Sequence, residues 1–269
     1  MKVSVMHPQT AQRNIPAEHM FLATDALGTK LGEGYIIPQF QPHLYPDCPI
    51  NLYFDMQCQP SARYVLFGAL VAQARQLREI NRDLQARMYT NLSPADSEML
   101  RFYEHNGFLL SDEEQEMELY LPEGDGVLPM NCSVADIPLN TMEEQAAFIQ
   151  RLWANDINYL DASYLLQMKH TQPHFLAMGL YRNNDLAGEV LLHGIGDTAE
   201  LSAIYITSAM RRQGMGHALL HRAMAVMARE GVSRITTRIL TRSTPQKQLM
   251  ASFGGRTVGT SAIFPGLFL

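Results

Sequence analysis

The sequence predicts a protein of the α/β class, with two domains that each form a twisted mixed sheet flanked by helices. Over residues 200–230, a β-branched strand, a loop rich in arginine and glycine, and an amphipathic helix follow one another. A pattern of elements repeats at an offset of 147 residues. A segment rich in proline and glycine separates the two halves, so we expect domains at residues 1–122 and 130–269 with a linker at 123–129.

The N-terminal half is expected to contain more strand than helix. Residues 1–19 show no clear period and are expected to form an arm. Leucines and one isoleucine at helical spacing predict a helix over residues 62–84. Ser93 and Pro94 are typical of a helix start, and Gly107 of a helix end. Strands are expected at residues 20–26, 34–40, 50–58, 88–92 and 115–121.

The C-terminal half is expected to begin with a strand and a capped helix. Asn140 or Thr141 can cap that helix, and Glu144 is placed to complete a capping box with Thr141. Three further helices are predicted. One spans residues 160–169, one follows directly after the loop of residues 208–216, and one spans residues 244–253. Strands are expected at residues 131–139, 174–181, 186–193, 201–207, 233–240, 256–258 and 261–269.

The repeat pairs residues 207–255 with the N-terminal half without a gap. The two long helices coincide, and so do the strands that follow them. The copies differ at the loop, where Arg211, Arg212 and Gly214 lie over Tyr64, Val65 and Phe67. Bulky apolar side chains cannot hold an anion, so the N-terminal copy is expected to have lost this site.

Composition and charge exclude several classes of protein. Residues 1–122 hold 9 Lys and Arg against 15 Asp and Glu, while residues 123–269 hold 12 of each. This distribution disfavours a nucleic-acid partner. No apolar run suits a membrane helix and the N-terminus lacks a signal-peptide core, so a cytoplasmic protein is expected. The acidic run at residues 112–118 is either a solvated face or an attraction for a cationic amine.

The loop after residue 207 has the chemistry of a phosphate site. Gly214 and Gly216 allow backbone NH groups to face a ligand, and the helix that follows presents the positive end of its dipole. Arg211 and Arg212 add positive charge. The sequence therefore predicts an anionic ligand at this loop.

The motif Arg211-x-x-Gly214-x-Gly216, after a strand and before a helix, resembles the acetyl-coenzyme A (acetyl-CoA) pyrophosphate loop of the GNAT superfamily of N-acetyltransferases. Phe102 to Phe108 also resemble that family's aromatic helix end. The resemblance implies two GNAT-like domains, of which the N-terminal one is degenerate. It also implies acetyl-CoA as co-substrate and a primary amine of a small molecule or peptide as acceptor.

The same resemblance implies which residues bind acetyl-CoA. Two parallel strands would separate around the cofactor, and the backbone of Ile204, Tyr205 and Ile206 would pair with its pantetheine arm. Ser243 would occupy the position where the family often has a polar residue that faces this arm. The loop and first helical turn that would bind the pyrophosphate comprise Arg211, Arg212, Gln213, Gly214, Met215, Gly216 and His217.

Transfer to an amine requires a base, because an ammonium group is not a nucleophile. Glu200 begins the strand that leads into the loop and is the expected base, as in family members with a carboxylate there; Asp197 and His193 are alternatives. Family members often protonate the leaving thiolate with a tyrosine, but that position holds Met250, which cannot donate a proton. Tyr205 and Tyr103 are possible substitutes.

The sequence thus predicts an acetyl-CoA-dependent N-acetyltransferase. A non-catalytic acyl-CoA-binding or regulatory protein remains an alternative because of Met250, and so does another kind of nucleotide-binding protein. His217 and His221 have helical spacing for a shared metal, but no third ligand is evident, so no metal is expected. The acceptor and the oligomeric state are not predicted.

Overall fold

The computed structural model describes residues 2–11, 15–42, 44–110, 112–157 and 159–269. The chain divides into two compact units, which we call unit 1 (Met1–Glu114 and Thr260–Leu269) and unit 2 (Gln115–Gly259). Within the described ranges, no helix is both long enough and apolar enough to span a membrane.

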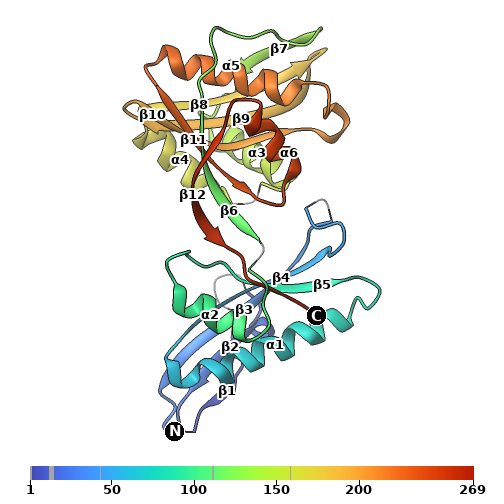
Figure 1. Ribbon diagram of the computed structural model, residues 1–269, viewed down its shortest axis with the longest axis vertical. Coiled ribbons are helices and arrows are strands. Elements are labelled where there is room, and N and C mark those ends of the chain that lie inside the picture. Colours follow the sequence, from blue (N-terminus) through green and yellow to red (C-terminus); the bar gives the residue numbers. More distant parts are fainter. Residues whose placement is uncertain (1, 12–14, 43, 111, 158) are drawn as a thin grey trace. The chain divides into compact units, whose positions relative to one another are not determined.

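Unit 1 contains a six-stranded sheet with the order β1-β2-β3-β4-β5-β13 (Figure 1). Strands β4 and β5 are parallel and the other neighbours are antiparallel. Leu66, Phe67 and Leu70 from α1 pack into a core with Phe102 and Phe108. Its elements are β1 (Ser4–Met6), η1 (Ala17–His19), β2 (Met20–Thr24), β3 (Lys30–Phe40), β4 (Ile50–Cys58), η2 (Pro60–Ala62), α1 (Arg63–Glu79), β5 (Ala86–Tyr89), α2 (Ser97–His105) and β13 (Gly266–Phe268).

Unit 2 contains a seven-stranded sheet with the order β12-β6-β11-β10-β9-β8-β7. Helix α5 lies on one face of it and helices α3 and α4 on the other (Figure 1), so each face has its own hydrophobic core. Its elements are β6 (Glu113–Leu119), β7 (Cys132–Asp136), α3 (Met142–Trp153), α4 (Ala162–Thr171), β8 (His174–Arg182), β9 (Asp185–Ile195), β10 (Thr198–Ile206), η3 (Ser208–Met210), α5 (Met215–Arg229), β11 (Arg234–Leu240), α6 (Thr244–Ala251) and β12 (Arg256–Ile263).

The predicted fold class is confirmed, and so is the repeat. In each unit a strand leads through a helix to a parallel strand: β4, α1 and β5 in unit 1, and β10, α5 and β11 in unit 2. The predicted capping box of α3 is also confirmed, because Thr141 accepts from the backbone of Glu144 and the Glu144 carboxylate accepts from the backbone of Thr141.

Two strands have other partners than the sequence suggested. The acidic strand β6 was expected to complete the N-terminal half, but it lies between β11 and β12. The last strand, β13, instead pairs with β5 in unit 1. Alternation buries Met117 and Leu119 of β6 against the core on the α5 face, yet such a pattern does not specify which sheet a strand joins. The compact units divide the chain after residues 114 and 259, so unit 1 contains segments from both ends of the chain.

The predicted linker packs against α5. The Asp125 carboxylate accepts from Arg222 at 2.7 Å and from Arg229 at 2.6 Å. Gly126, at φ 69°, lies so close to His221 that an added Cβ would meet its Nδ1 at 2.5 Å. The segment is thus held along one helix of unit 2, although its composition is typical of a flexible connection.

The arm predicted at the N-terminus is wrong in part, because β1 pairs with β2 and the His7 ring bonds to the carbonyl of Met20. Residues 12–14 of that arm lie outside the described residues. Several members of the acidic run have partners in the structure: buried Asp112 pairs with Arg87, Glu118 with Arg256, and Glu114 accepts from Ser261. These contacts explain the presence of several acidic residues in the run without a cationic amine substrate.

Candidate functional site

The two parallel strands β10 and β11 separate partway along their length. Their pairing runs from Thr198 opposite Arg234 to Leu201 opposite Thr237 and then stops, while β10 continues to Ile206 and β11 to Leu240. The Thr237 hydroxyl donates to the carbonyl of Leu201 at 3.0 Å, next to the last pair. After Leu201, the edge of β10 that faces β11 is therefore left without a strand partner. A ligand that carries amide groups could form backbone hydrogen bonds with such an edge.

A bulge in β10 coincides with this separation. On its other edge β10 pairs with β9, and the register shifts between Leu201 and Ala203 so that Ser202 has no partner. The shift changes which side chains face which core. Leu201 and Ile204 face the α5 side, whereas Ala203 and Tyr205 face the side of α3 and α4. A bulge re-aims side chains at the point where regular pairing ends.

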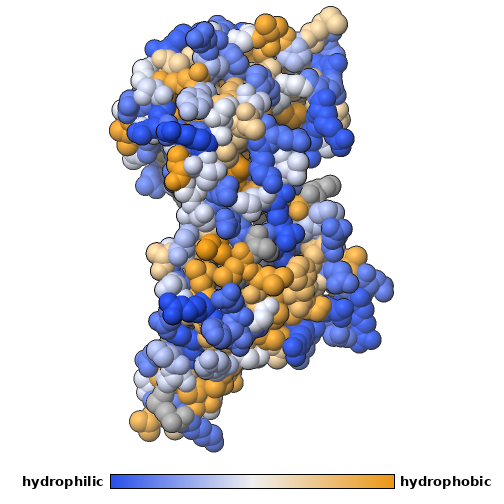
Figure 2. Space-filling model, viewed as in Figure 1, coloured by the Kyte–Doolittle hydropathy of each residue, from blue (hydrophilic) through white to orange (hydrophobic). Residues whose placement is uncertain are grey.

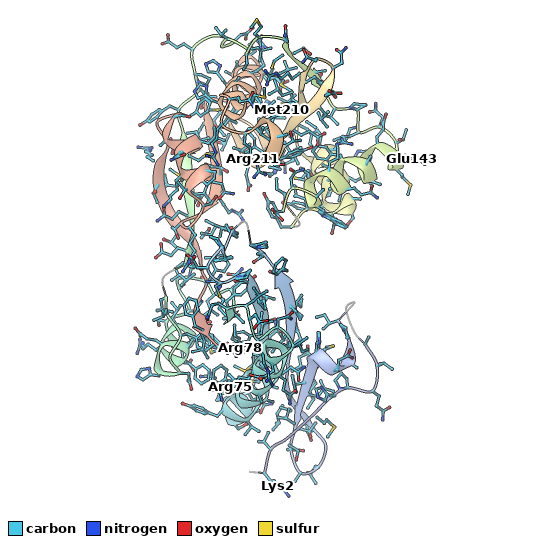
Figure 3. The ribbon with its side chains drawn as sticks, turned by 90° about the vertical axis from the view of Figure 1, so that its right-hand side faces the viewer. Lys2, Arg75, Arg78, Glu143, Met210 and Arg211 are labelled. Atoms are coloured by element: carbon cyan, nitrogen blue, oxygen red, sulfur yellow. The ribbon has the colours of Figure 1, made fainter. Side chains whose placement is uncertain are left out.

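The loop between β10 and α5 is shaped by two residues with positive φ. Arg212 has φ 58° and Gly214, which precedes α5, has φ 75°. No side chain caps the start of α5, so the first-turn NH groups have no side-chain acceptor. Met210 and Arg211, which belong to this stretch, are labelled in Figure 3, and the guanidinium of Arg211 is bonded to the carbonyl of Ile206 at 2.9 Å.

The start of α5 is open and positively charged. Arg211, Arg212, Gln213 and Gly214 are exposed, and an added Cβ at Gly214 would meet no atom within 4 Å. Met215 is 2 % exposed and belongs to the core, so only its backbone can face a ligand. The site thus combines free NH groups, a helix dipole and arginine side chains, which is the donor set that a pyrophosphate requires.

Sequence reasoning missed one cation here. Arg182, the last residue of β8, donates to the Gln213 side chain and lies 3.8 Å from the Met210 sulfur. The strand order brings it to the loop, because β8 is separated from β10 only by β9. The sequence predicted that Arg182 follows directly after a strand, but it gave no sign that Gln213 and Met210 would lie beside it.

Two other predicted binding residues lie near the loop. The His217 ring stacks on Phe253 with 4.5 Å between centroids, and burial, with the nearby charge of His221, lowers the pKa of His217. Ser243 precedes α6 and makes no capping hydrogen bond with its side chain. An added Cβ at Gly216 would lie 3.6 Å from Ile206 and 3.9 Å from Leu249, which is ordinary contact.

The predicted base lies where the strands separate. Glu200 pairs across the sheet with His193, and its carboxylate lies 3.6 Å from the Arg238 guanidinium. The Glu200 side chain is 36 % exposed, so it can exchange protons with solvent or a substrate. Asp197, one of the alternatives, lies in the turn before β10 and bonds to Ser233 and Thr198, at the end of the strand away from the loop.

His193 is buried and bonded to the bulge residue. Its side chain is 6 % exposed, and its Nε2 lies 2.7 Å from the Ser202 hydroxyl. Burial lowers the pKa of His193, and the neighbouring charge of Glu200 opposes that effect only in part. The imidazole is therefore neutral near pH 7. The carbonyl of Ser202 also accepts from Tyr159, so the turn between α3 and α4 reaches the same point of β10.

A buried ion pair fixes the backbone of β10 near the loop. The Glu189 carboxylate is fully buried, and it accepts from Arg151 at 2.7 to 3.1 Å and from the Tyr205 hydroxyl at 2.5 Å. Burial, followed by the bond to Glu189, raises the pKa of Tyr205 above its usual range. The Tyr205 side chain thus faces α3, and only its backbone lies along the separated edge.

Met250, at the position of the family's tyrosine, and Tyr103, one of the predicted substitutes, are both buried in cores. Met250 is 2 % exposed and belongs to the core on the α5 face. Tyr103 is 1 % exposed and packs against Phe54, Phe67 and Phe108 in unit 1. Neither side chain is available to a substrate. Among the described residues, no three His, Cys, Asp or Glu side chains are grouped for a metal ion.

Unit 1 has no counterpart of the charged loop. Residues 60–62 lead through η2 directly into α1, where Leu66 and Phe67 are buried and Tyr64 and Val65 are 70 % and 45 % exposed. Figure 2 shows hydrophobic residues at the surface around α1 and α2. The position that holds arginines and glycines in unit 2 is therefore apolar in unit 1.

Comparison with known families gives a match within unit 2. Residues 141–254 match the model of the Acetyltransferase (GNAT) family. This segment contains α3 to α6, the separating strands and the loop. The chain therefore carries a GNAT-family acetyltransferase domain in its C-terminal half, and unit 1 repeats part of that fold. No curated protein matches the sequence.

Solved structures with a similar fold cover nearly the whole chain. A GCN5-related N-acetyltransferase from Sphaerobacter thermophilus is 14 % identical, with a TM-score of 0.52 over 95 % of this chain and 82 % of its own. Eis1 from Mycobacterium abscessus is 12 % identical, with a TM-score of 0.54 over 98 % and 73 %. A probable N-acyltransferase from Enterococcus faecalis is 10 % identical, with a TM-score of 0.58 over 92 % and 61 %. At such low identity the likeness establishes the fold alone.

Proposed function

We propose that unit 2 binds acetyl-CoA and transfers its acetyl group to a primary amine of a small molecule or peptide. One observation carries this proposal: β10 and β11 separate after Leu201, on the strand that leads into the charged loop. A long ligand with an anionic end and amide groups along its length fits such a site. Acetyl-CoA, the usual co-substrate of GNAT enzymes, has both.

The residues of the site divide the binding between them. The pyrophosphate is bound by the NH groups of residues 213–217 and by Arg211, Arg212 and Arg182. The backbone of residues 204–206 pairs with the pantetheine arm, and Ser243 faces the same arm. His217 completes the phosphate end. Unit 1 binds no acetyl-CoA, because apolar residues replace the loop.

The transfer itself needs a proton acceptor near the point of separation. Glu200 takes the proton from the attacking amine. Its nearest cation, Arg238, is 56 % exposed and 3.6 Å away, so the pair is weak and Glu200 remains available. The acidic side chain would also attract a cationic acceptor.

A non-catalytic acyl-CoA-binding protein is the second candidate. The observation that favours it is the burial of Met250 at the position where a proton donor was expected. Such a protein would bind acetyl-CoA through the same loop and strand edge but would release no thiol in the presence of amines.

Calorimetric titration with acetyl-CoA tests the binding site. Arg212→Ala should weaken binding about 10-fold to 100-fold, because a charged hydrogen bond contributes roughly 1.5–3 kcal/mol. Gly216→Trp should abolish it by filling the space between α5 and the strand edge. Arg229→Ala removes an arginine side chain at the other end of α5. This variant is the matched control and should bind acetyl-CoA normally.

Competition and turnover separate the candidates. Coenzyme A should displace acetyl-CoA and ATP should not; the reverse would favour another nucleotide-binding function. Thiol release is then followed over a panel of primary amines, and Glu200→Gln should lower it about 100-fold or more. Tight binding without release for any amine would favour the non-catalytic protein. Absence of binding by the wild-type protein would refute both.

A further inference from the structure

The proposed reaction leaves the departing thiolate without an evident proton donor, because Met250 and Tyr103 are buried and the Tyr205 hydroxyl is bonded to Glu189. The structure offers a hydroxyl group elsewhere. Ser202 is the first residue of β10 beyond the last pair with β11, and it is also the unpaired residue of the bulge against β9. It therefore lies where the two strands begin to separate.

We propose that Ser202 donates the proton to the leaving sulfur and that His193, acting through Ser202, replaces that proton. This inference rests on the proposed acetyl transfer and names a proton donor for it. Ser202 would be a catalytic residue, because its hydroxyl touches the reacting sulfur. His193 would be a positioning residue, since its ring contacts Ser202 rather than the substrate.

One hydrogen bond and one strand pairing outline a path for protons from Glu200 to Ser202. The Ser202 hydroxyl lies 2.7 Å from Nε2 of His193, and His193 pairs across the strands with Glu200. Side chains of directly paired residues on one face lie about 4.5–5.5 Å apart at Cβ, which is within reach of a glutamate and an imidazole. The path thus connects the expected base with the expected acid.

The imidazole is in the right protonation state for this role. Because burial keeps His193 neutral, one ring nitrogen carries a proton and the other can accept one. The proposal assigns the proton to Nε2, so that His193 donates to Ser202 and the serine proton is free to point at the sulfur. An isolated serine is a poor acid, but here its oxygen gains a proton as it gives one.

The step balances in atoms and charge. The amine nitrogen bonds to the carbonyl carbon as the carbon–sulfur bond breaks, and the surplus amine proton passes to Glu200. The sulfur takes the Ser202 proton, and the Ser202 oxygen takes the proton from Nε2 of His193. In the same concerted step Glu200 passes that proton to Nδ1 of His193, so the imidazole stays neutral. The products are the acetylated amine and the free thiol, and Glu200 is again a carboxylate. The ring proton of His193 returns to Nε2 by exchange with water before the next turnover.

The backbone around Ser202 keeps the hydroxyl in place. The Ser202 carbonyl accepts from Tyr159, and the carbonyl of Leu201 accepts from Thr237. Both neighbouring peptide groups are therefore fixed by side chains from other elements. A bulge residue held in this way presents its side chain in one orientation.

The test compares two donors, acetyl-CoA and its analogue in which oxygen replaces the thioester sulfur. An alkoxide is a much stronger base than a thiolate, so its departure depends more on an acid. The acceptor is the primary amine of the panel that turns over fastest. Hydrolysis, with water as the acceptor, is measured in parallel. Product formation is followed by chromatography, and acetyl-CoA affinity is measured by calorimetry for each variant.

Ser202→Ala should keep its affinity for acetyl-CoA but lower kcat about tenfold or more with the thioester, and by a larger factor with the oxygen ester. His193→Gln should also lower kcat more with the oxygen ester than with the thioester, since an amide can bond to Ser202 but cannot relay a proton. Ser202→Thr retains the hydroxyl and should keep most activity. Ser233→Ala, at the other end of the sheet's parallel pair, is the matched control and should behave as wild type.

Equal losses with the two donors, or wild-type rates in Ser202→Ala, would overturn the assignment. An acetyl group found on Ser202 by mass spectrometry would also overturn it, because the serine would then be a nucleophile. If the wild-type protein binds no acetyl-CoA, the proposed function itself fails. Binding without the expected donor dependence rejects only the role of Ser202.

Discussion

The buried pair of Glu189 and Arg151 should show an asymmetry that follows from its burial. The Glu189 side chain is fully buried, whereas the Arg151 side chain is 36 % exposed. Removing one partner of a buried ion pair costs about 3–5 kcal/mol, mainly because the other charge is left without compensation. Water can reach Arg151 but not Glu189, so the two single substitutions should differ.

We expect Glu189→Gln to lower the free energy of unfolding by about 3 kcal/mol, at the lower end of that range. Arg151→Met should cost about 4–5 kcal/mol near neutral pH, because it leaves the buried carboxylate with only the Tyr205 hydroxyl.

Fluorescence provides an assay specific to unit 2. The chain has one tryptophan, Trp153, at the end of the helix that carries Arg151, and its indole NH donates to the carbonyl of Leu160 at 2.9 Å. Urea unfolding followed at this side chain reports on unit 2 without interference from unit 1. The double variant Glu189→Gln/Arg151→Met completes a thermodynamic cycle.

The double variant should lose at least about 1 kcal/mol less than the sum of the single variants. Additive losses would refute the reasoning, because they would mean that the two side chains do not interact. Equal single losses would refute the argument from burial. Wild-type stability in Glu189→Gln would show that the ion pair contributes nothing.

Two further predictions concern the same sheet. An added Cβ at Gly188 would lie 2.3 Å from the carbonyl oxygen of Tyr205, so Gly188→Ala should force β9 from β10, lower the melting temperature and weaken acetyl-CoA binding at least tenfold. Gly259→Ala, where the Cβ would meet nothing within 4 Å, is the control; a stable, binding Gly188→Ala would contradict the register. Because burial depresses the pKa of His193 below 6.5, the unfolded state binds more protons just below that pH, and stability should decline as pH falls through this window. His193→Gln should flatten that decline in urea unfolding at pH 5 to 7, and an unchanged slope would show that another group is responsible.

Local chemistry allowed most elements to be predicted from the sequence. Alternation and β-branched residues located β4 at residues 50–58, and the Thr141 capping box located the start of α3. These signals act between residues that are close along the chain, so they survive without knowledge of the fold. The repeat at an offset of 147 residues likewise compares only element types, and both units contain it.

The loop could also be predicted, because its requirements are local. Only glycine readily adopts the φ of 75° found at Gly214, and arginines beside a helix start indicate an anion whatever surrounds them. Arg182 could not be found in this way, because it comes from a strand two positions away in the sheet. Spatial neighbours of this kind carry no signal in a single sequence.

Only the tertiary structure decided which strands pair and what surrounds the chemistry. The alternation in β6 predicts a strand but not its place between β11 and β12, because backbone hydrogen bonds do not depend on side-chain identity. The bulge at Ser202, its bond to His193 and the burial of Glu189 arise from the register of β9 against β10. The sequence by itself determined the fold class and the loop of arginines and glycines before α5. The folded chain decided which acids, bases and hydroxyl groups meet, since these contacts join residues that lie far apart along it.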